Sequence, residues 1–348
     1  MQDDTRRAFL QWSTSSVLVG GLAGMMGCGP GAAVNAPGNA MPAGVTVAAP
    51  GGKRYKAAFS NAGLKATWCA HGMDTVKWWA DRLGIDVTIY DSQLNIDKQR
   101  QDIEDMATKE WDFVAMQAYA IQTLEAPVRR LIDKGIPVID FDTRIVPEGT
   151  DIGLWTFMAP DHEKLAEQAT GMVVQAMGGK GKIVHTQGAL AHSGAQLRAK
   201  GFRNVIAKYP EIEVIDEQPG DWDINKVGQI WDDLLVKYDQ IDGAFCHNDD
   251  MAMAAVQAIK RSGKDRKVIF GSIDAQERGI SGVMSGDLIC SAMNAAGRIH
   301  LTALMVGYFA CAMGQKKDQV PPFIAIDNPV VTKENAASFK YLMENRMI

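Results

Sequence analysis

The stretch Gly243-Ala-Phe-Cys-His-Asn-Asp-Asp-Met-Ala-Met-Ala-Ala-Val-Gln-Ala-Ile259 contains the unit from which the fold is built. Its first four residues form a short, mostly apolar run, which is typical of a buried strand, and a helical pattern begins at Asp249. An Asn or Asp at this junction caps the helix, and acidic residues in the first turn suit the helix dipole. The stretch therefore predicts a strand that leads directly into a helix, with polar side chains where the strand ends.

The same alternation of strand and helix runs in both directions from this unit, starting at Lys53. The predicted strands are 55–60, 86–90, 113–117, 137–141, 152–157, 182–186, 213–216, 243–246, 268–272 and 288–293. The predicted helices are 69–83, 97–109, 122–134, 162–177, 193–208, 225–237, 249–261 and 296–313, followed by an extended return segment at 321–331. Such alternation produces right-handed βαβ units with parallel strands. Ten strands exceed one comfortable sheet, so we expect an α/β fold with two doubly wound parallel-sheet lobes.

The composition of the chain excludes several classes of protein. The 348 residues are 47% hydrophobic and 22% charged, which is ordinary for a globular protein and rules out disorder of the whole chain. The net charge is −5 and there is no long basic run, so the sequence argues against a nucleic-acid partner.

The first 52 residues have the pattern of an export signal followed by a flexible tether. Thr5-Arg6-Arg7 precedes a short apolar stretch, which is the pattern of a bacterial twin-arginine export signal. The stretch ends in Met25-Met-Gly-Cys28, which resembles a lipoprotein signal box whose cysteine is acylated after cleavage. We therefore expect a signal at 1–27, lipidation of Cys28 that anchors the chain to a membrane, and a flexible tether at 28–52.

The remaining cysteines show no metal-binding spacing, and they are too few for a disulfide scaffold. Because the twin-arginine route resembles export of proteins that have already folded in a reducing cytosol, we expect free and mostly buried thiols. They are Cys69, Cys246, Cys290 and Cys311.

The sequence offers little support for catalysis. It contains no G-x-S-x-G, H-E-x-x-H or G-x-x-x-x-G-K-[ST] motif, and its six histidines are scattered. His247-Asn-Asp-Asp250 is better explained by helix capping than by a metal site. We therefore expect no catalytic residues, no metal and no cofactor.

Polar and aromatic residues instead gather just beyond the ends of the predicted strands. In open α/β sheets, ligands bind at the carboxyl ends of the strands, and two lobes would direct two such sets into one cleft. Carboxylate, amide and guanidinium groups bind hydroxyls, and a Trp ring covers the C–H face of a sugar ring, so this set suits a neutral polyhydroxy ligand. The candidate ligand-binding residues are Asn61, Trp68, Gln117, Asp142, Arg144, Arg198, Trp222, Asn248, Asp274 and Asn294.

Several segments in the same order resemble the type I, ribose-binding-like sugar-binding proteins of bacterial ABC importers. They are Tyr90-Asp-Ser-Gln-Leu-Asn95, Gly135-Ile-Pro-Val-Ile139, Gln187-Gly188, Gly201-Phe202, Asn248-Asp-Asp-Met-Ala252 and Gly271-Ser-Ile-Asp274. The resemblance extends from about 55 to 315. It implies an N-terminal lobe of 53–159 plus 295–321 and a C-terminal lobe of 160–294 plus 322–348, joined by a three-segment hinge near 157–161, 292–296 and 320–324.

The resemblance also implies roles for single residues. Trp68 and Trp222 resemble the stacking aromatics, Asp142 the acid that binds ring hydroxyls, and Arg198 the guanidinium of the second lobe. Gln117, Asn248, Asp274 and Asn294 resemble the remaining polar contacts. The sequence departs from the family pattern at Thr143, where an Arg is usual and where Arg144 follows one residue later, and at Ile273, where an aromatic is frequent. These departures admit a C4–C6 sugar alcohol beside a pentose or hexose.

The function implied by the resemblance is capture of a monosaccharide or sugar alcohol and its delivery to a membrane permease. The protein would be exported to the periplasm or cell surface, anchored by lipid and monomeric. A receptor that presents a sugar-like signal to a membrane sensor is the main alternative, and a sugar-modifying enzyme is a weaker one. A repressor of the lactose-repressor type shares the fold, but it needs a DNA-binding head where this chain has its leader and tether.

Overall fold

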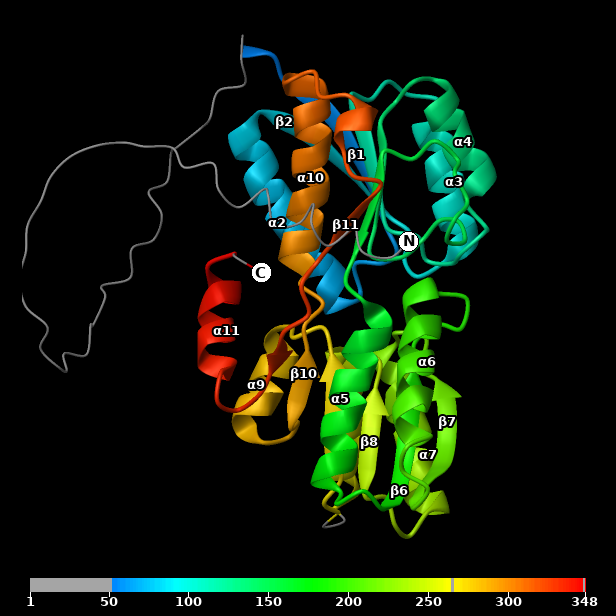
Figure 1. Cartoon of the computed structure of the whole chain (residues 1–348), viewed down its shortest axis with the longest axis vertical. Helices are drawn as coiled ribbons and strands as arrows, with labels where there is room; N and C mark the ends of the chain where they lie inside the picture. Colours follow the sequence, from blue (N-terminus) through cyan, green and yellow to red (C-terminus); the bar gives the residue numbers. More distant parts are fainter. Residues whose placement is uncertain (1–51, 264–265, 347) are drawn as a thin grey trace, which may run out of the picture. The chain divides into compact units, whose positions relative to one another are not determined.

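The computed structural model describes residues 52–263, 266–346 and 348. The predicted signal at 1–27, the lipidation site Cys28 and the tether up to residue 51 lie outside the described residues. The described residues form two six-stranded sheets, and helices cover both faces of each sheet (Figure 1). This arrangement confirms the predicted α/β fold with two doubly wound lobes.

The first sheet has the strand order β11-β5-β4-β3-β1-β2, and all its neighbouring strands are parallel. Its strands are β1 (Tyr55–Asn61), β2 (Ile85–Asp91), β3 (Phe113–Met116), β4 (Val138–Phe141), β5 (Thr156–Ala159) and β11 (Phe323–Ala325). Helices α2 (Thr67–Leu83) and α10 (Ala296–Ala312) pack on one face, and α3 (Ile96–Met106) and α4 (Glu125–Asp133) pack on the other.

The second sheet has the order β12-β10-β9-β8-β6-β7, and only the short edge strand β12 is antiparallel to its neighbour. Its strands are β6 (Gly181–Gln187), β7 (Ile212–Pro219), β8 (Gly243–Cys246), β9 (Ile269–Ile273), β10 (Cys290–Ala292) and β12 (Val330–Val331). Helices α5 (His162–Ala176) and α6 (Ser193–Ile206) cover one face. Helices α7 (Ile224–Lys237), α8 (Asp249–Ser262) and α9 (Glu277–Ser285) cover the other, and α11 (Ala336–Glu344) packs on α9.

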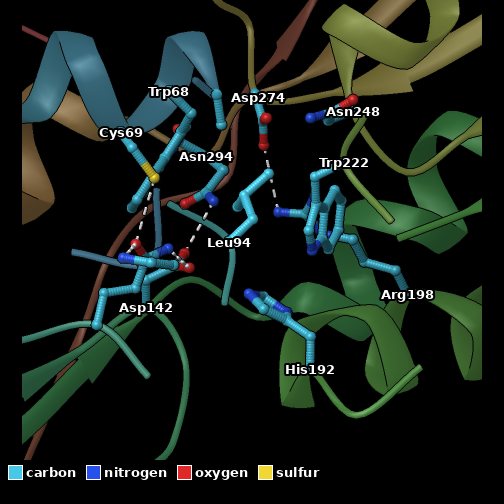
Figure 2. Close-up of a pocket in the computed structure, with 13 residues that line it drawn as sticks. Trp68, Cys69, Leu94, Asp142, His192, Arg198, Trp222, Asn248, Asp274 and Asn294 are labelled. Atoms are coloured by element: carbon cyan, nitrogen blue, oxygen red, sulfur yellow. Dashed lines mark hydrogen bonds and ion pairs between the residues drawn. The ribbon is translucent and has the colours of Figure 1, made fainter. Parts of the chain in front are cut away.

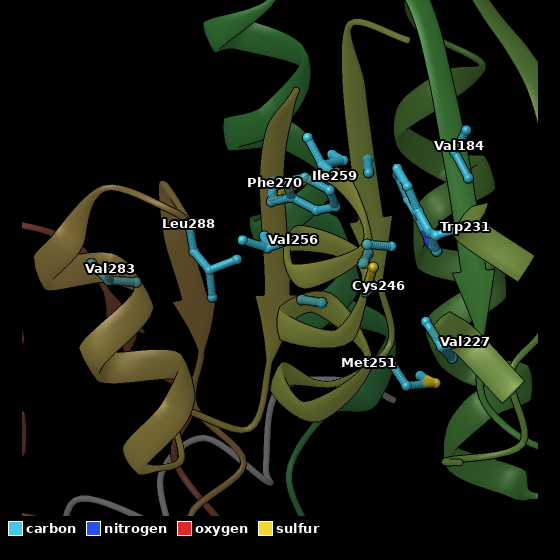
Figure 3. Packing of buried hydrophobic residues seen from close by; sticks show 14 of the residues in the cluster. Val184, Val227, Trp231, Cys246, Met251, Val256, Ile259, Phe270, Val283 and Leu288 are labelled. Carbon is cyan, nitrogen blue, oxygen red and sulfur yellow. The ribbon is translucent and has the colours of Figure 1, made fainter. Parts of the chain in front are cut away.

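The core beneath α7 and α8 shows how the sequence builds one of these layers (Figure 3). Trp231 is fully buried there and stacks at a tilt on Phe270, while its indole N–H donates to the Thr186 hydroxyl. Asn248 begins α8 because its side-chain oxygen accepts from the backbone N–H of Met251, and Gly263 ends the helix in the left-handed conformation. Asn248 thus provides the cap that the sequence predicts at this junction.

Within its described part, the chain passes between the two sheets three times. It crosses after β5, after β10, and between β11 and β12. The third crossing differs from the expected boundary at 321–322, because Phe323 to Ala325 pair with β5 and remain in the first sheet. The return segment thus adds β11 to the first sheet before it crosses and β12 to the second sheet after it crosses.

Other differences are local. The strand expected at 152–157 lies instead at β5, because Gly153 takes a positive φ of 95° and its N–H bonds to the Asp151 side chain, which makes a turn before the strand. Helices α9 and α11 are additional to the predicted set.

The four described cysteines are free thiols, three of them buried, as predicted. Within the described residues, no helix is long and apolar enough to cross a membrane.

Candidate ligand-binding site

A pocket lies between the two lobes, at the carboxyl ends of strands from both sheets (Figure 2). Its cavity volume is about 40 Å³. Eight of the ten predicted residues line it: Trp68, Gln117, Asp142, Arg198, Trp222, Asn248, Asp274 and Asn294. The remaining lining residues are Ala62, Ala66, Cys69, Leu94 and His192. The sequence prediction that two sets of strand ends meet in one cleft agrees with this arrangement.

Asp142 follows β4 and is held by amides on both of its oxygens. Gln117 donates to Oδ2 over 3.0 Å, and Asn294 donates to Oδ1 over 2.9 Å. Burial opposes ionisation of this carboxyl, but the charge of Arg198 and the bond from Asn294 hold the pKa of Asp142 below its usual range. Asp142 is therefore an ionised acceptor at neutral pH.

Arg198 and Asp274 form a buried pair on the other side of the pocket. The Arg198 Nη2 lies 3.3 Å from the Asp274 Oδ1, and its Nη1 donates to the backbone oxygen of His247. Burial raises the pKa of Asp274 well above its usual value, and Arg198 opposes that rise. The two acidic groups of the pocket thus differ, since Asp142 favours the carboxylate and Asp274 holds a proton more readily. A ligand hydroxyl, which both donates and accepts, suits such a pair.

The two tryptophans are placed by different contacts. Trp68 lies in the first turn of α2 and its indole N–H donates to the backbone oxygen of Asn294 over 2.7 Å. Trp222 lies in the loop between β7 and α7, in the left-handed conformation with a φ of 63°, and packs against Gly188. The guanidinium of Arg198 lies 5.7 Å from the centre of the Trp222 ring. Each ring therefore presents an apolar surface to the pocket from a different lobe.

Two of the predicted polar residues also serve the fold. Gln117 uses its amide oxygen to accept from Ala62 N–H and from the Cys69 thiol, and its amide nitrogen to hold Asp142. Asn248 uses its oxygen as the cap of α8, which leaves its amide nitrogen without a partner among the described residues. Gln117 is thus placed to position Asp142, whereas Asn248 retains a donor for the pocket.

Two predicted residues lie outside the pocket. Asn61 is buried behind it, where its side-chain oxygen accepts from Gly63 N–H over 2.9 Å. Arg144 turns away after Asp142 takes a left-handed φ of 62°, so that its guanidinium lies 4.3 Å from the centre of the Phe157 ring and near Glu148. The tight turn at the end of β4 separates Arg144 from the acid that it follows in sequence.

His192 is a lining residue that the sequence prediction missed. It caps α6, because its Nδ1 accepts from Ala195 N–H, and burial lowers its pKa to about 3. The ring is therefore neutral with its proton on Nε2, which makes that nitrogen a donor. Its position just before a predicted helix was the only signal in the sequence.

Two buried polar atoms of the lining residues have no hydrogen-bond partner within the described parts of the chain: Trp222 Nε1 and Asn294 Oδ1. Across residues 52–263, 266–346 and 348 no group of three His, Cys, Asp or Glu side chains could hold a metal ion.

Comparison with known proteins gives relatives over most of the chain. A family model described as "Periplasmic binding protein domain" matches residues 57–316. The xylitol-binding protein of Mycolicibacterium smegmatis is 29% identical over 265 residues, which cover 76% of this chain and 72% of that protein. The D-allose-binding periplasmic protein of Escherichia coli is 24% identical, with 73% of this chain and 84% of that protein covered.

Solved structures share the fold. The periplasmic binding protein component of the arabinose ABC transporter from Shewanella sp. ANA-3, bound to α- and β-L-arabinofuranose, superposes with a TM-score of 0.75. It is 23% identical, and the match covers 84% of this chain and 95% of that one. A Mycobacterium smegmatis protein in complex with β-D-fucofuranose gives a TM-score of 0.76 at 23% identity, with 84% of this chain and 97% of that chain covered.

Proposed function

The chain belongs to the family of periplasmic binding protein domains, and from this membership we propose that it is the substrate-binding component of an ABC importer. In this role it captures a monosaccharide or a C4–C6 sugar alcohol between its two lobes and delivers it to a membrane permease. The proposed role is binding without chemical conversion of the ligand. The relatives whose names or titles state a sugar or sugar-alcohol ligand support this class of ligand.

The observation that carries the proposal is the composition of the pocket between the lobes. Asp142 and Asn294 approach it from one side, and Arg198 and Asp274 from the other, so both lobes supply charged and amide groups. These groups can exchange hydrogen bonds with several hydroxyls, while the tryptophan rings offer apolar faces for C–H groups. A neutral polyhydroxy compound matches this set better than an anion, because the ionised Asp142 already offsets the charge of Arg198 within the pocket.

The proposed mechanism is closure of the lobes around the ligand. The three crossings after β5, after β10 and between β11 and β12 would serve as the hinge. A ligand that contacts both lobes binds the closed arrangement more tightly than an open one, so binding shifts the population toward closure. The closed form would then be the form that the permease receives.

Export by the twin-arginine route, lipidation of Cys28 and a monomeric state complete the proposal. They rest on the leader sequence and on the family, because the leader lies outside the described residues. Mass spectrometry of the membrane-bound protein tests the lipid. An acylated N-terminal Cys28 supports the anchor, and an unmodified cysteine contradicts it.

The experiment that tests the binding role is thermal unfolding of the purified protein against a panel of pentoses, hexoses and C4–C6 sugar alcohols. A ligand at 100 times its dissociation constant adds about 2.7 kcal/mol, which shifts the midpoint by a few degrees. Asp274→Ala should then weaken binding of the identified ligand by about 2 kcal/mol, because it removes hydrogen bonds to the ligand and to Arg198 in a dry site. No response to any member of the panel would contradict the proposed ligand class.

A further inference from the structure

Leu94 is an unusual residue among those that line the pocket. It lies in the loop between β2 and α3, and both Gln93 and Leu94 take the left-handed conformation, with φ of 55° and 59°. Residues with a branched or bulky side chain rarely adopt this conformation, which Gly and Asn tolerate more readily. The half-buried side chain of Leu94 points into the pocket, where Figure 2 shows it between Asn294 and Trp222.

The loop around Leu94 is held firmly by the neighbouring backbone. Leu94 N–H donates to the oxygen of Ala62 over 2.8 Å, and Asp91 Oδ1 accepts from the backbone N–H groups of Leu64 and Gln93. Gly63 provides the room for the side chain, because a Cβ at that position would lie 2.7 Å from Leu94 atoms. Left-handed residues that the surroundings enforce are typical of ligand-binding loops, so this geometry indicates a role at the pocket.

We propose that Leu94 is a specificity-determining residue that selects a ligand carrying a C–H, deoxy or methyl group, not a hydroxyl, at the position facing it. This inference rests on the proposed function, since it concerns the same pocket. Leucine has no donor or acceptor, and a hydroxyl held against it would lose its bonds to water without replacement. Leu94 is the one branched aliphatic side chain in a lining that otherwise consists of polar groups, two alanines, a cysteine and two tryptophan rings, so its contact separates ligands that differ by a hydroxyl at that position.

The variant Leu94→Asn tests this role with little risk to the fold. Asparagine has as many side-chain heavy atoms as leucine, tolerates the left-handed conformation, and supplies both a donor and an acceptor. The unliganded variant should therefore unfold at the wild-type midpoint or slightly above it. Leu190→Asn is a matched control, because Leu190 is 59% exposed and does not line the pocket.

The measurement is titration calorimetry of wild type, Leu94→Asn and Leu190→Asn with pairs of ligands that differ by one hydroxyl. The pairs are D-ribose and 2-deoxy-D-ribose, D-galactose and D-fucose, L-mannose and L-rhamnose, and, among sugar alcohols, galactitol and L-fucitol. In at least one pair the wild type should prefer the deoxy member. Leu94→Asn should shift the ratio of dissociation constants by about 10-fold toward the hydroxylated member, and the control should leave the ratio unchanged.

The outcomes separate this inference from the proposed function. Binding with the same ratio in wild type and Leu94→Asn would overturn the role of Leu94 while the binding function stands. A wild type that prefers the hydroxylated member of every pair would also overturn it. If the wild type bound no sugar or sugar alcohol at all, the proposed function would fail, and the role of Leu94 would fail with it.

Discussion

Asp250→Ala should weaken ligand binding without weakening the unliganded fold. Asp250 lies in the first turn of α8, in the second lobe, and its Oδ2 accepts from both the backbone N–H and the hydroxyl of Thr67, over 3.0 and 2.9 Å. Thr67 begins α2 in the first lobe, where the N-cap residue Ala66 makes no side-chain bond and the first turn has no acidic residue. The cap of α2 therefore comes from the opposite lobe.

The size of the effect follows from this geometry. Loss of a helix cap costs about 0.5–2 kcal/mol, and each bond to a charged group contributes about 1.5–3 kcal/mol. The carboxylate is only 4% exposed, so solvent screens the contact weakly, although its burial offsets part of the gain. We take about 2 kcal/mol as the net loss, which corresponds to about 30-fold in the dissociation constant. If closure joins the lobes, this loss appears only when ligand is bound.

The assay combines calorimetric titration with thermal unfolding of the unliganded protein. Asp250→Ala should raise the dissociation constant and leave the unliganded midpoint near that of the wild type. Asp97→Ala is the matched control, since Asp97 is a first-turn aspartate of α3 whose side chain is 77% exposed and pairs within its own helix. Wild-type affinity in Asp250→Ala, or an equal loss of stability with and without ligand, would refute the reasoning.

Two further predictions test the packing around the site. Gly188→Ala places a Cβ 2.0 Å from the Trp222 ring and should displace that ring. Calorimetric titration should therefore show at least 10-fold weaker ligand binding. Gly228→Ala is the control, because its Cβ meets its nearest neighbour at 3.7 Å, and it should bind ligand like the wild type. His300 is buried with its pKa lowered to about 4, so the unfolded state takes up its proton first and stability falls as the pH drops below about 6.5. Between about pH 7 and about pH 5.5, the free energy of unfolding measured with urea should fall by about 1 kcal/mol less in His300→Gln than in the wild type. An equal fall in both proteins would contradict the lowered pKa of His300.

The sequence predicted the pocket well where residues follow strands. In parallel sheets the carboxyl ends share one edge, so a polar residue just beyond a buried strand lies at that edge whatever the loop does next. Asp142, Asp274 and Asn294 all meet this condition, and all line the pocket. Arg144 shows the limit of the rule, because one left-handed residue at Asp142 redirects everything that follows it.

The residues that the prediction missed depend on backbone geometry that the sequence does not reveal. Leu94 enters the pocket only because its loop takes two consecutive left-handed residues, which a leucine gives no reason to expect. Ala66 marks a similar limit at the start of α2. The helix begins two residues earlier than the pattern predicts, because its cap is a distant carboxylate and not a local side chain.

The tail illustrates a third limit, since short edge strands carry almost no pattern of their own. The three residues of β11 are exposed or half-buried, and they form a strand only because β5 offers a free edge. Pairing with that edge moved the third crossing beyond the predicted position. Tertiary context therefore decided a domain boundary that local sequence could not.

Asn294 connects the parts of the site that come from different segments. It lies where the chain crosses from β10 to α10, its backbone oxygen holds Trp68, and its amide holds Asp142. Gln117 also donates to Asp142. The Trp68 ring and the ionised acid are therefore both hydrogen-bonded to a residue of one crossing segment. Closure by rotation at that crossing would move the ring and the acid relative to the second lobe. In the proposed mechanism, Asn294 would therefore couple ligand selection to lobe movement.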